Sequence, residues 1–383
     1  MKDRYDVVVG GGSVAGLAFA AEASKRGLSV LVGEEHGEIG EPEKCDGLVS
    51  LRGLRRFGFD PRSEVIQNTI ASGLIHSPGG KEIGVNATGL EVVVLDRSAY
   101  DKELCETAES WGADVVKGAR VTLTGESQSG VTADVGGSSV EASFYVDATG
   151  PHAGRRHGTL AAAKYEIEAG WIREKVVEVF LDAERYPGFF AWVIPYGPGL
   201  AKVGAAGFGI DAFKALDAFL SSRPHRRLRR VAAPIYIGGP RESFVTARRV
   251  LVGESAGQVK PTTAGGIMTS IAGAVIAARW VSEAVQERDP RKLANYQPDW
   301  EGRFLKEMKT MQRLRRVFEN LSNSDMDSVV TSLASSKLLS RLSRSDFDFH
   351  ASALLGALGV SGVLRIARVV ASAEARSLLA GGR

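Results

Sequence analysis

The sequence predicts an α/β fold with α+β character. A βαβ domain at the N-terminus carries an inserted antiparallel sheet and is followed by a helical C-terminal region. Three observations predict this organisation. An apolar run, a glycine cluster, an alanine-rich segment and a second apolar run follow one another within residues 5–35. Residues 160–245 alternate strand-like and turn segments, and the chain beyond Pro298 has a helical pattern rich in Arg, Ser and Leu.

The first unit has the plan strand, tight turn, helix, strand and acid, which is that of a Rossmann-like dinucleotide-binding unit. Residues 5–9 form the first strand, residues 17–26 the helix and residues 28–32 the second strand. Glycines allow the sharp turn and the close approach of a pyrophosphate, and the helix N-terminus attracts its charge. A nucleotide site is therefore expected, with a chance glycine-rich turn as the alternative.

Two registers of the glycine motif are open: Gly10-x-Gly12-x-x-Ala15 and Gly11-x-Ser13-x-x-Gly16. The second is preferred because it gives the first strand a longer run, although it places Ser13 where a second glycine is usual. It also puts Glu34 at 18 residues beyond Gly16, near the spacing expected of an acid that accepts hydrogen bonds from ribose hydroxyls.

Later segments continue the pattern and set the expected domain limits. We expect a helix over residues 98–111, strands over 115–121 and 131–146, a strand at 250–252 and a helix over 266–281. These assignments predict a discontinuous nucleotide-binding domain of residues 1–50, 95–160 and 247–285. They also predict a substrate-binding sheet domain of residues 51–94 and 161–246 and a C-terminal helical region of residues 286–383.

Composition limits the class of protein. The chain has 44% hydrophobic and 24% charged residues, as globular proteins do, and its net charge of +3 is too small to indicate nucleic acid binding. Two cysteines give no disulfide framework and favour a reducing compartment, and the six histidines lack metal-ligand spacing, so no metal is expected. No signal peptide and no apolar stretch of about 18 residues is present, which favours a cytoplasmic location.

Three further motifs point to one cofactor. They are residues 95–104 (LDRSAYDKEL), residues 146–150 (VDATG), and residues 252–257 (VGESAG) with their continuation at 261–267 (PTTAGGI). Together with the N-terminal unit they resemble the FAD-dependent oxidoreductases that include p-hydroxybenzoate hydroxylase and the geranylgeranyl reductases. The resemblance implies FAD as cofactor.

Two segments make the similarity more particular. Residues 39–48 (IGEPEKCDGL) and residues 187–195 (PGFFAWVIP) resemble the archaeal geranylgeranyl reductase family, the digeranylgeranylglycerophospholipid reductases. The family pattern of the second segment is P-x-x-Y-x-W-x-F-P, in which this chain has Phe190 for the Tyr and Ile194 for the Phe. The resemblance extends over about residues 1–300.

The resemblance also implies residue roles. Glu34 would hold the adenosine ribose, Arg97 would contact the phosphate or ribityl region, and Val121 would give main-chain contacts to adenine. Glu254 stands where the family usually has Asp, and its longer side chain would rearrange the contact with the ribityl or pyrophosphate group. The expected FAD-binding residues are Gly11, Ser13, Ala15, Gly16, Glu34, Glu35, Cys45, Asp46, Gly47, Arg97, Val121, Glu254, Gly257, Gly265, Gly266 and Ile267.

The helix expected to begin after Gly265 and Gly266 is also consistent with a flavin site on physical grounds. A helix N-terminus would stabilise the negative charge near N1 of reduced flavin. Cys45 lies in a polar loop after the nucleotide unit and is expected near the flavin, with an inert small residue as the alternative.

Other assignments keep two interpretations. Phe190, Trp192 and Pro195 would form an aromatic wall for an apolar substrate, or simply core packing in a strand. Glu254 would alternatively be an N-cap acid and Arg97 a surface ion-pair partner. The basic run of residues 223–230 would be a solvated face or attract anionic lipid headgroups, and residues 350–379 would complete the fold, dock on a membrane or cap a lipid tunnel.

The leading hypothesis is an FAD-dependent reductase that hydrogenates the double bonds of geranylgeranyl chains in a membrane lipid or its prenyl precursor. Cys45 is the candidate proton donor. The electron donor would be a ferredoxin or NAD(P)H, and contact with a membrane would be peripheral. Alternatives are a flavin hydroxylase or quinone-type oxidoreductase of the same fold, and a non-catalytic lipid- or nucleotide-binding protein.

Overall fold

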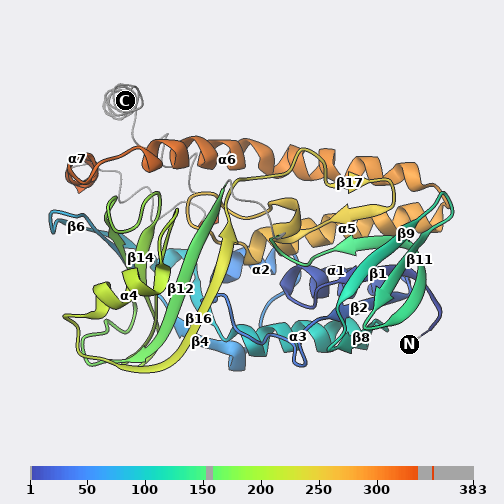
Figure 1. The fold of residues 1–383 in the computed structure, drawn as a ribbon, viewed down its shortest axis with the longest axis horizontal. Coiled ribbons are helices and arrows are strands. Elements are labelled where there is room, and N and C mark those ends of the chain that lie inside the picture. The colour runs from blue at the N-terminus through green and yellow to red at the C-terminus, as the bar shows by residue number, and fades with distance from the viewer. Residues whose placement is uncertain (1, 152–157, 335–346, 349–383) are drawn as a thin grey trace.

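The larger of two main sheets contains the predicted βαβ unit and, with its helices, is the unit expected to bind a nucleotide (Figure 1). The computed structural model describes residues 2–151 and 158–334 together with residues 347 and 348. Its eight-stranded sheet has the order β17-β18-β11-β1-β2-β8, with β10 paired to β11 and β9 paired to β10. Its strands are β1 (Arg4–Gly10), β2 (Val30–Glu34), β8 (Asp114–Lys117), β9 (Val121–Glu126), β10 (Val131–Val135), β11 (Ser138–Asp147), β17 (Val245–Thr246) and β18 (Arg249–Leu251).

Three helices cover one face of this sheet. They are α1 (Val14–Lys25), α3 (Arg97–Ser110) and α5 (Ile267–Gln286). Strand β1 is parallel to β2 and β11, and its residues Val7, Val8 and Val9 are fully buried. Val7 and Val9 face the helices, whereas Val8 packs towards β9 and β10. Burial on both faces explains why β1 is a continuous apolar run rather than an alternating one.

A seven-stranded sheet forms the second main unit, with the order β16-β12-β15-β14-β13-β5-β6. All of its pairs are antiparallel except that of β13 with β5. Its strands are β5 (Ser72–His76), β6 (Glu82–Asn86), β12 (Thr159–Glu168), β13 (Val176–Leu181), β14 (Phe190–Gly197), β15 (Leu200–Gly207) and β16 (Arg226–Tyr236).

The two faces of this sheet have different neighbours. Tyr165, Ile167 and Val203 pack against helix α4 (Ala212–Leu220). The opposite face carries a second apolar cluster that includes Trp192 and also takes in Val94, which belongs to a small third sheet. That second face therefore packs against the third sheet.

A small third sheet lies between the two, with the order β3-β7-β4. Its strands are β3 (Leu48–Ser50), β4 (Ile66–Thr69) and β7 (Val92–Leu95), and the short helix α2 (Leu51–Arg55) follows β3 directly. Sequence patterns did not separate this sheet from the antiparallel one, because short strands give little periodicity to distinguish them.

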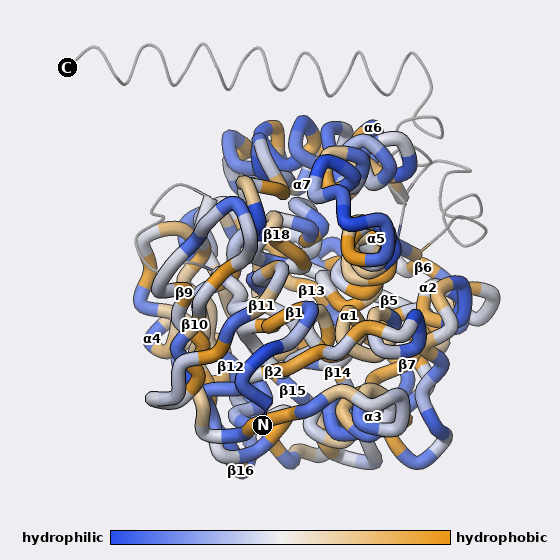
Figure 2. Tube along the Cα trace, turned by 90° about the vertical axis from the view of Figure 1, so that its right-hand side faces the viewer, coloured by the Kyte–Doolittle hydropathy of each residue, from blue (hydrophilic) through white to orange (hydrophobic). Residues whose placement is uncertain are grey.

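Two helices complete the described chain: α6 (Tyr296–Glu319) and α7 (Asn323–Ala334). In Figure 1, α6 runs above α5 and continues over the antiparallel sheet. Figure 2 shows α5 mainly apolar, whereas α6 and α7 mix hydrophilic and apolar residues. The predicted α/β fold with an antiparallel sheet and C-terminal helices is thus confirmed. Residues 350–379, for which a membrane or tunnel role was considered, lie outside the described residues.

Observed boundaries differ slightly from those expected. Helix α1 starts at Val14 rather than residue 17, because Ser13 already occupies the N-cap position after the three-glycine turn. Helix α5 continues to Gln286, beyond residue 281, since its buried stripe extends through Ala284.

Candidate functional site

The glycine turn joins β1 to α1 through contacts that leave no room for side chains. A Cβ on Gly16 would lie 2.0 Å from the carbonyl oxygen of Gly11, and a Cβ on Gly11 would lie 2.5 Å from that of Ala148. Gly11 also has φ +105°, which favours glycine. Ser13 makes no side-chain cap to α1, because its hydroxyl donates to Asp101 Oδ2 at 2.7 Å. The first amides of α1 therefore lack a side-chain acceptor and suit an anion such as a pyrophosphate.

Glu34 closes this turn from the end of β2. Its Oε2 accepts the Gly12 N–H at 2.7 Å, and its Oε1 lies 2.6 Å from His36 Nδ1. Glu34 is 9% exposed, whereas the neighbouring Glu35 points outward and pairs with Arg120 at 2.5 Å. The buried carboxylate beside the glycines is thus the one placed to accept ribose hydroxyls.

Val121 is the first residue of β9 and packs against Gly33 of β2. Its side chain is buried, and a Cβ on Gly33 would lie 2.4 Å from Val121 Cγ2. The position is fixed by packing, so any contact of Val121 with an adenine ring would be through its main chain, as the resemblance implies.

Arg97 lies at the start of α3, between the glycine turn and the Cys45 loop, defined as residues 41–47. Its guanidinium contacts Asp101 Oδ1 at 2.8 Å and donates to the Ser13 hydroxyl at 3.2 Å. Burial opposes its charge, but the Asp101 carboxylate and the Cys45 side chain raise the pKa of Arg97 above its ordinary value. Arg97 is 7% exposed, so it is a buried cation and not a surface ion-pair partner.

Side chains of the antiparallel sheet hold the Cys45 loop in place. Lys164 Nζ donates to the Cys45 carbonyl at 3.0 Å and lies 3.4 Å from Asp46 Oδ1. Trp192 Nε1 donates to Asp46 Oδ2 at 2.7 Å, and the Gly47 N–H lies 3.5 Å from Cys45 Sγ. The loop thereby joins the nucleotide-binding unit to the substrate-type sheet.

A second buried lysine reinforces this contact. Lys202 Nζ donates to Glu43 Oε1 at 2.6 Å and to the Asp46 carbonyl at 3.3 Å. Lys202 is 1% and Glu43 7% exposed, and Arg229 adds an ion pair to Glu41. Burial alone would raise the pKa of Glu43, but Lys202 and Lys164 hold it below its usual range. Sequence inspection missed both lysines, although a lone lysine inside an apolar strand is a signal of a buried partner.

The aromatic wall is divided between two faces of β14. Trp192 is 8% exposed and covers Gly204, where a Cβ would lie 2.2 Å from the indole ring. Phe190 stacks on Phe189 with ring centroids 3.9 Å apart. Strand alternation puts Phe190 and Trp192 on the face towards the Cys45 loop and Pro195 on the other face. The structure therefore groups only two of the three expected wall residues.

Helix α5 supplies a second uncapped N-terminus. Its N-cap is Gly266, which makes no side-chain cap, and the helix begins at Ile267. A Cβ on Gly265 would lie 2.6 Å from Lys260 Cε, and one on Gly257, with φ +71°, would lie 2.1 Å from the Gly239 carbonyl oxygen. The backbone amides at 266 and 267 are thus placed to receive a group with negative charge.

Glu254 is bound to β16. Its Oε1 accepts the Tyr236 N–H at 2.8 Å, and burial raises the pKa of Glu254 to about 7. Ala15 packs close to the neighbouring Gly253, where a Cβ would lie 2.7 Å from Ala15 Cβ. The carboxyl of Glu254 thus contacts β16.

Glu254→Gln is expected to raise stability at alkaline pH. The folded pKa of about 7 exceeds the ordinary value of 4.5, so ionisation is disfavoured only in the folded state. Wild type should lose stability as pH rises from 4.5 to 7, by about 2–3 kcal/mol, whereas Gln keeps the acceptor for Tyr236 without a charge. Thermal unfolding at pH 5 and pH 8, with the exposed Glu242→Gln as control, measures this. Equal stability of wild type and Glu254→Gln at pH 8 would contradict it.

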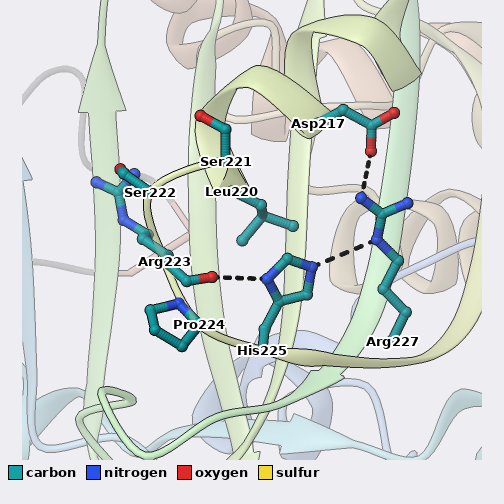
Figure 3. A pocket seen from close by; sticks show the side chains of 8 residues that line it. All are labelled: Asp217, Leu220, Ser221, Ser222, Arg223, Pro224, His225 and Arg227. Atoms are coloured by element: carbon teal, nitrogen blue, oxygen red, sulfur yellow. Dashed lines mark hydrogen bonds and ion pairs between the residues drawn. The ribbon is translucent and has the colours of Figure 1, made fainter.

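An open pocket of about 410 Å³ lies elsewhere, at the end of α4 and the start of β16 (Figure 3). There Arg227 pairs with Asp217 at 2.7 Å, and His225 Nδ1 contacts the Arg223 carbonyl at 2.7 Å. None of its lining residues belongs to the Cys45 loop. Arg226 and Arg229 also form ion pairs with acidic side chains, which reduces the net charge of the basic run of residues 223–230.

Within the described ranges, no group of three or more His, Cys, Asp or Glu side chains is arranged to hold a metal ion. Two uncapped helix N-termini, a buried acid at the ribose position and a loop containing a thiol instead suit an elongated dinucleotide with a flavin at one end.

Comparisons with known proteins agree in family and fold. No family model matches the chain. It is 32% identical over 363 residues to digeranylgeranylglycerophospholipid reductase 2 of Methanopyrus kandleri, across 86% of this chain and 90% of that protein. The chain belongs to this reductase family. A digeranylgeranylglycerophospholipid reductase 2 of Methanothermobacter thermautotrophicus is 30% identical over 366 residues, across 88% of this chain and 94% of that one.

Solved structures place this reductase family member in the fold of FAD-dependent oxidoreductases. A geranylgeranyl bacteriochlorophyll reductase-like protein of Thermoplasma acidophilum matches with a TM-score of 0.86 and 22% identity, over 97% of this chain and 99% of that one. The halogenase PltM in complex with FAD matches with a TM-score of 0.66 and 13% identity, over 97% and 96%. The resemblance to the archaeal reductases that the sequence motifs indicated is confirmed.

Proposed function

We propose that this chain uses FAD to reduce isoprenoid double bonds of a geranylgeranyl lipid or its prenyl precursor. Family membership and the relatives' name support the substrate class. The structural observation that carries the proposal is the hydrogen bond of 2.7 Å from Trp192 to Asp46, which joins the aromatic wall to the Cys45 loop. That contact brings an apolar surface for a prenyl chain next to the expected flavin loop.

The geometry supports a set of residues that would hold FAD. Glu34 would accept the adenosine ribose, the amides of α1 would take the pyrophosphate, and Arg97 would neutralise charge beside it. The Cys45 loop and the N-terminus of α5 would hold the flavin. When bound and reduced, FAD supplies the hydride for the alkene.

The protein must then align the alkene and provide a proton. An isolated alkene is a poor electrophile, so alignment and proton supply carry much of the barrier. Trp192 and Phe190 position the chain by apolar contact. Cys45, whose side chain hydrogen-bonds Arg97, is the residue that we propose gives a proton to the second carbon.

A direct assay tests the proposal. The purified protein, reduced without oxygen, is given a digeranylgeranylglyceryl phospholipid, and the lipid is analysed by mass spectrometry. Mass gains in steps of two hydrogens are expected. An oxygenated product would indicate the hydroxylase alternative, and a purified protein without a flavin spectrum would favour the non-catalytic one.

Cys45→Ser is expected to slow reduction by about 10²- to 10⁴-fold, the usual contribution of a general acid, without loss of flavin. Cys105→Ser is the matched control, because Cys105 is buried on α3 and burial raises the pKa of its thiol to about 11. Turnover of Cys45→Ser at the wild-type rate would remove Cys45 as proton donor.

The partners are a prenyl lipid and an electron donor, for which ferredoxin and NAD(P)H are the candidates. Stopped-flow reduction of the flavin by each donor separates them. Among the helices of the described ranges, none has the length and apolarity to cross a bilayer. Because the relatives are named as reductases of a membrane phospholipid, we propose that access to the lipid is by peripheral contact from the cytoplasm, measurable by vesicle co-sedimentation.

A further inference from the structure

Arg315 interrupts the buried stripe of helix α6. Every other buried position of that helix is aromatic or methionine, and the full set is Tyr296, Trp300, Phe304, Met308, Met311 and Arg315. The spacing of the stripe calls for an apolar residue at 315. Arg315 is nevertheless only 5% exposed, so a guanidinium stands where an apolar side chain would cost less.

The hydrogen bonds of Arg315 are incomplete. Its Nε donates to Glu319 Oε1 at 2.8 Å, and its Nη1 reaches the Pro261 carbonyl at 3.4 Å. Within the part of the chain that the structure describes, the buried Nη2 has no hydrogen-bond partner. A buried charged donor without an acceptor is unfavourable, and it indicates that a ligand completes the site.

The surroundings place this guanidinium at the proposed lipid site. It lies over the rings of Phe189 and Phe208, 5.6 Å and 5.2 Å from their centroids. Both rings belong to the apolar cluster that contains Phe190 and Trp192. Arg315 thus stands at one end of the aromatic wall, where a prenyl chain would meet its polar head.

The contact with Pro261 gives a second reference point. Pro261 opens the loop that leads to Gly265, Gly266 and the N-terminus of α5. Arg315 therefore touches both the wall from the antiparallel sheet and the loop from the nucleotide-binding unit. A head group bound there would be fixed relative to both.

We propose that Arg315 binds a phosphate oxygen of the substrate head group, so that the enzyme prefers prenyl chains carrying a phosphate ester. The inference rests on the proposed function and names the residue that selects the head. Glu319 occupies Nε, which leaves the edge formed by Nη1 and Nη2 to donate to two oxygens of one phosphate. A planar guanidinium suits that bidentate contact better than an ammonium.

The test compares two substrates that differ only in the head. Geranylgeranyl phosphate and geranylgeraniol share one chain, and their binding to the flavin-loaded full chain is measured by quenching of tryptophan fluorescence. Reduction of both is followed by mass spectrometry. Wild type is expected to bind the phosphate ester more tightly. Arg315→Gln should weaken binding of the ester by about 10- to 100-fold and change that of the alcohol by less than about 3-fold.

Two variants keep the result interpretable. Arg315→Lys retains the positive charge but loses the planar guanidinium with its two parallel donors, and it should bind the ester with intermediate affinity. The exposed Arg313→Gln on the same helix should bind as wild type does. Equal weakening for both substrates in Arg315→Gln, or none, would show that Arg315 only packs on the phenylalanines and would overturn the proposal. Inorganic phosphate that binds as tightly as the ester would overturn the assignment to a lipid head.

Binding also separates this inference from the proposed function. If wild type reduces neither substrate but binds the ester in a manner that depends on Arg315, the head-group site stands and the reductase assignment fails. If both substrates are reduced and bound equally by wild type and Arg315→Gln, the reductase assignment stands and the head-group site fails.

Discussion

Gly16→Ala is expected to yield a chain that no longer retains flavin. The new Cβ would lie 2.0 Å from the Gly11 carbonyl oxygen. Gly11 itself lies against the Ala148 carbonyl, so the clash can be relieved only by a shift of the backbone. Moving the turn displaces the α1 amides that take the pyrophosphate. The flavin-to-protein ratio should fall at least tenfold, and overpacking should lower the free energy of unfolding by about 1–3 kcal/mol.

Gly37→Ala is the matched control for this result. Gly37 lies near Glu34 in the chain, its added Cβ would meet nothing within 4 Å, and its φ is not in the left-handed region. It should bind flavin as wild type does. Flavin binding of Gly16→Ala at the wild-type ratio would show that the amides of α1 do not hold the pyrophosphate.

The sequence predicts this turn because everything that defines it is local. Glycine spacing, the following helix and the acid at the end of the second strand lie within residues 10–34, so pattern alone identifies them. The same holds for the uncapped start of α5 after Gly266. Local motifs also carried the family resemblance that the comparisons confirm.

Contacts between distant segments were not predictable in the same way. Lys164 is 119 residues from Cys45 in sequence, and Lys202 is 159 residues from Glu43. No pattern relates them until the strands are paired. The separation of Pro195 from Trp192, by contrast, follows from strand alternation and was available from sequence, since the two differ by an odd number of positions.

Glu254 shows a third limit of prediction from sequence. The sequence shows that Glu254 stands at the family's Asp position, but it does not show which group the carboxyl contacts. The Tyr236 amide that it binds is presented by β16, the edge strand of the other sheet. A side chain one methylene longer can reach a different hydrogen-bond partner, and only the folded structure shows which partner lies within reach.

Lys202→Met is expected to be the most destabilising of these substitutions. It would leave Glu43 buried without its 2.6 Å partner, and breaking a buried ion pair from one side costs about 3–5 kcal/mol. The Cys45 loop would also lose the donor to the Asp46 carbonyl. Urea unfolding at pH 7 measures the loss, with the exposed Lys214→Met as control.

The pH dependence of stability distinguishes loss of the ion pair from a general packing defect, because only loss of the ion pair gives a stability difference that changes with pH in a known direction. The folded pKa of Glu43 lies below its ordinary value of 4.5, so its contribution is complete above 4.5 and is lost as pH falls through the lower folded value. In Lys202→Met that stabilisation is largely absent. The difference in stability between wild type and Lys202→Met should therefore shrink on acidification.

A double substitution isolates the charge. Glu43→Gln removes the carboxylate that Lys202→Met leaves with only the longer ion pair to Arg229, at 3.7 Å, so the double variant should recover part of the lost stability although it has one more substitution. If stability instead falls further, and the deficit of Lys202→Met is the same at pH 4 as at pH 7, then side-chain volume and not the Lys202–Glu43 ion pair holds the Cys45 loop. Recovery with restored flavin content would show that the charge of Glu43, once its lysine is gone, is what displaces the loop.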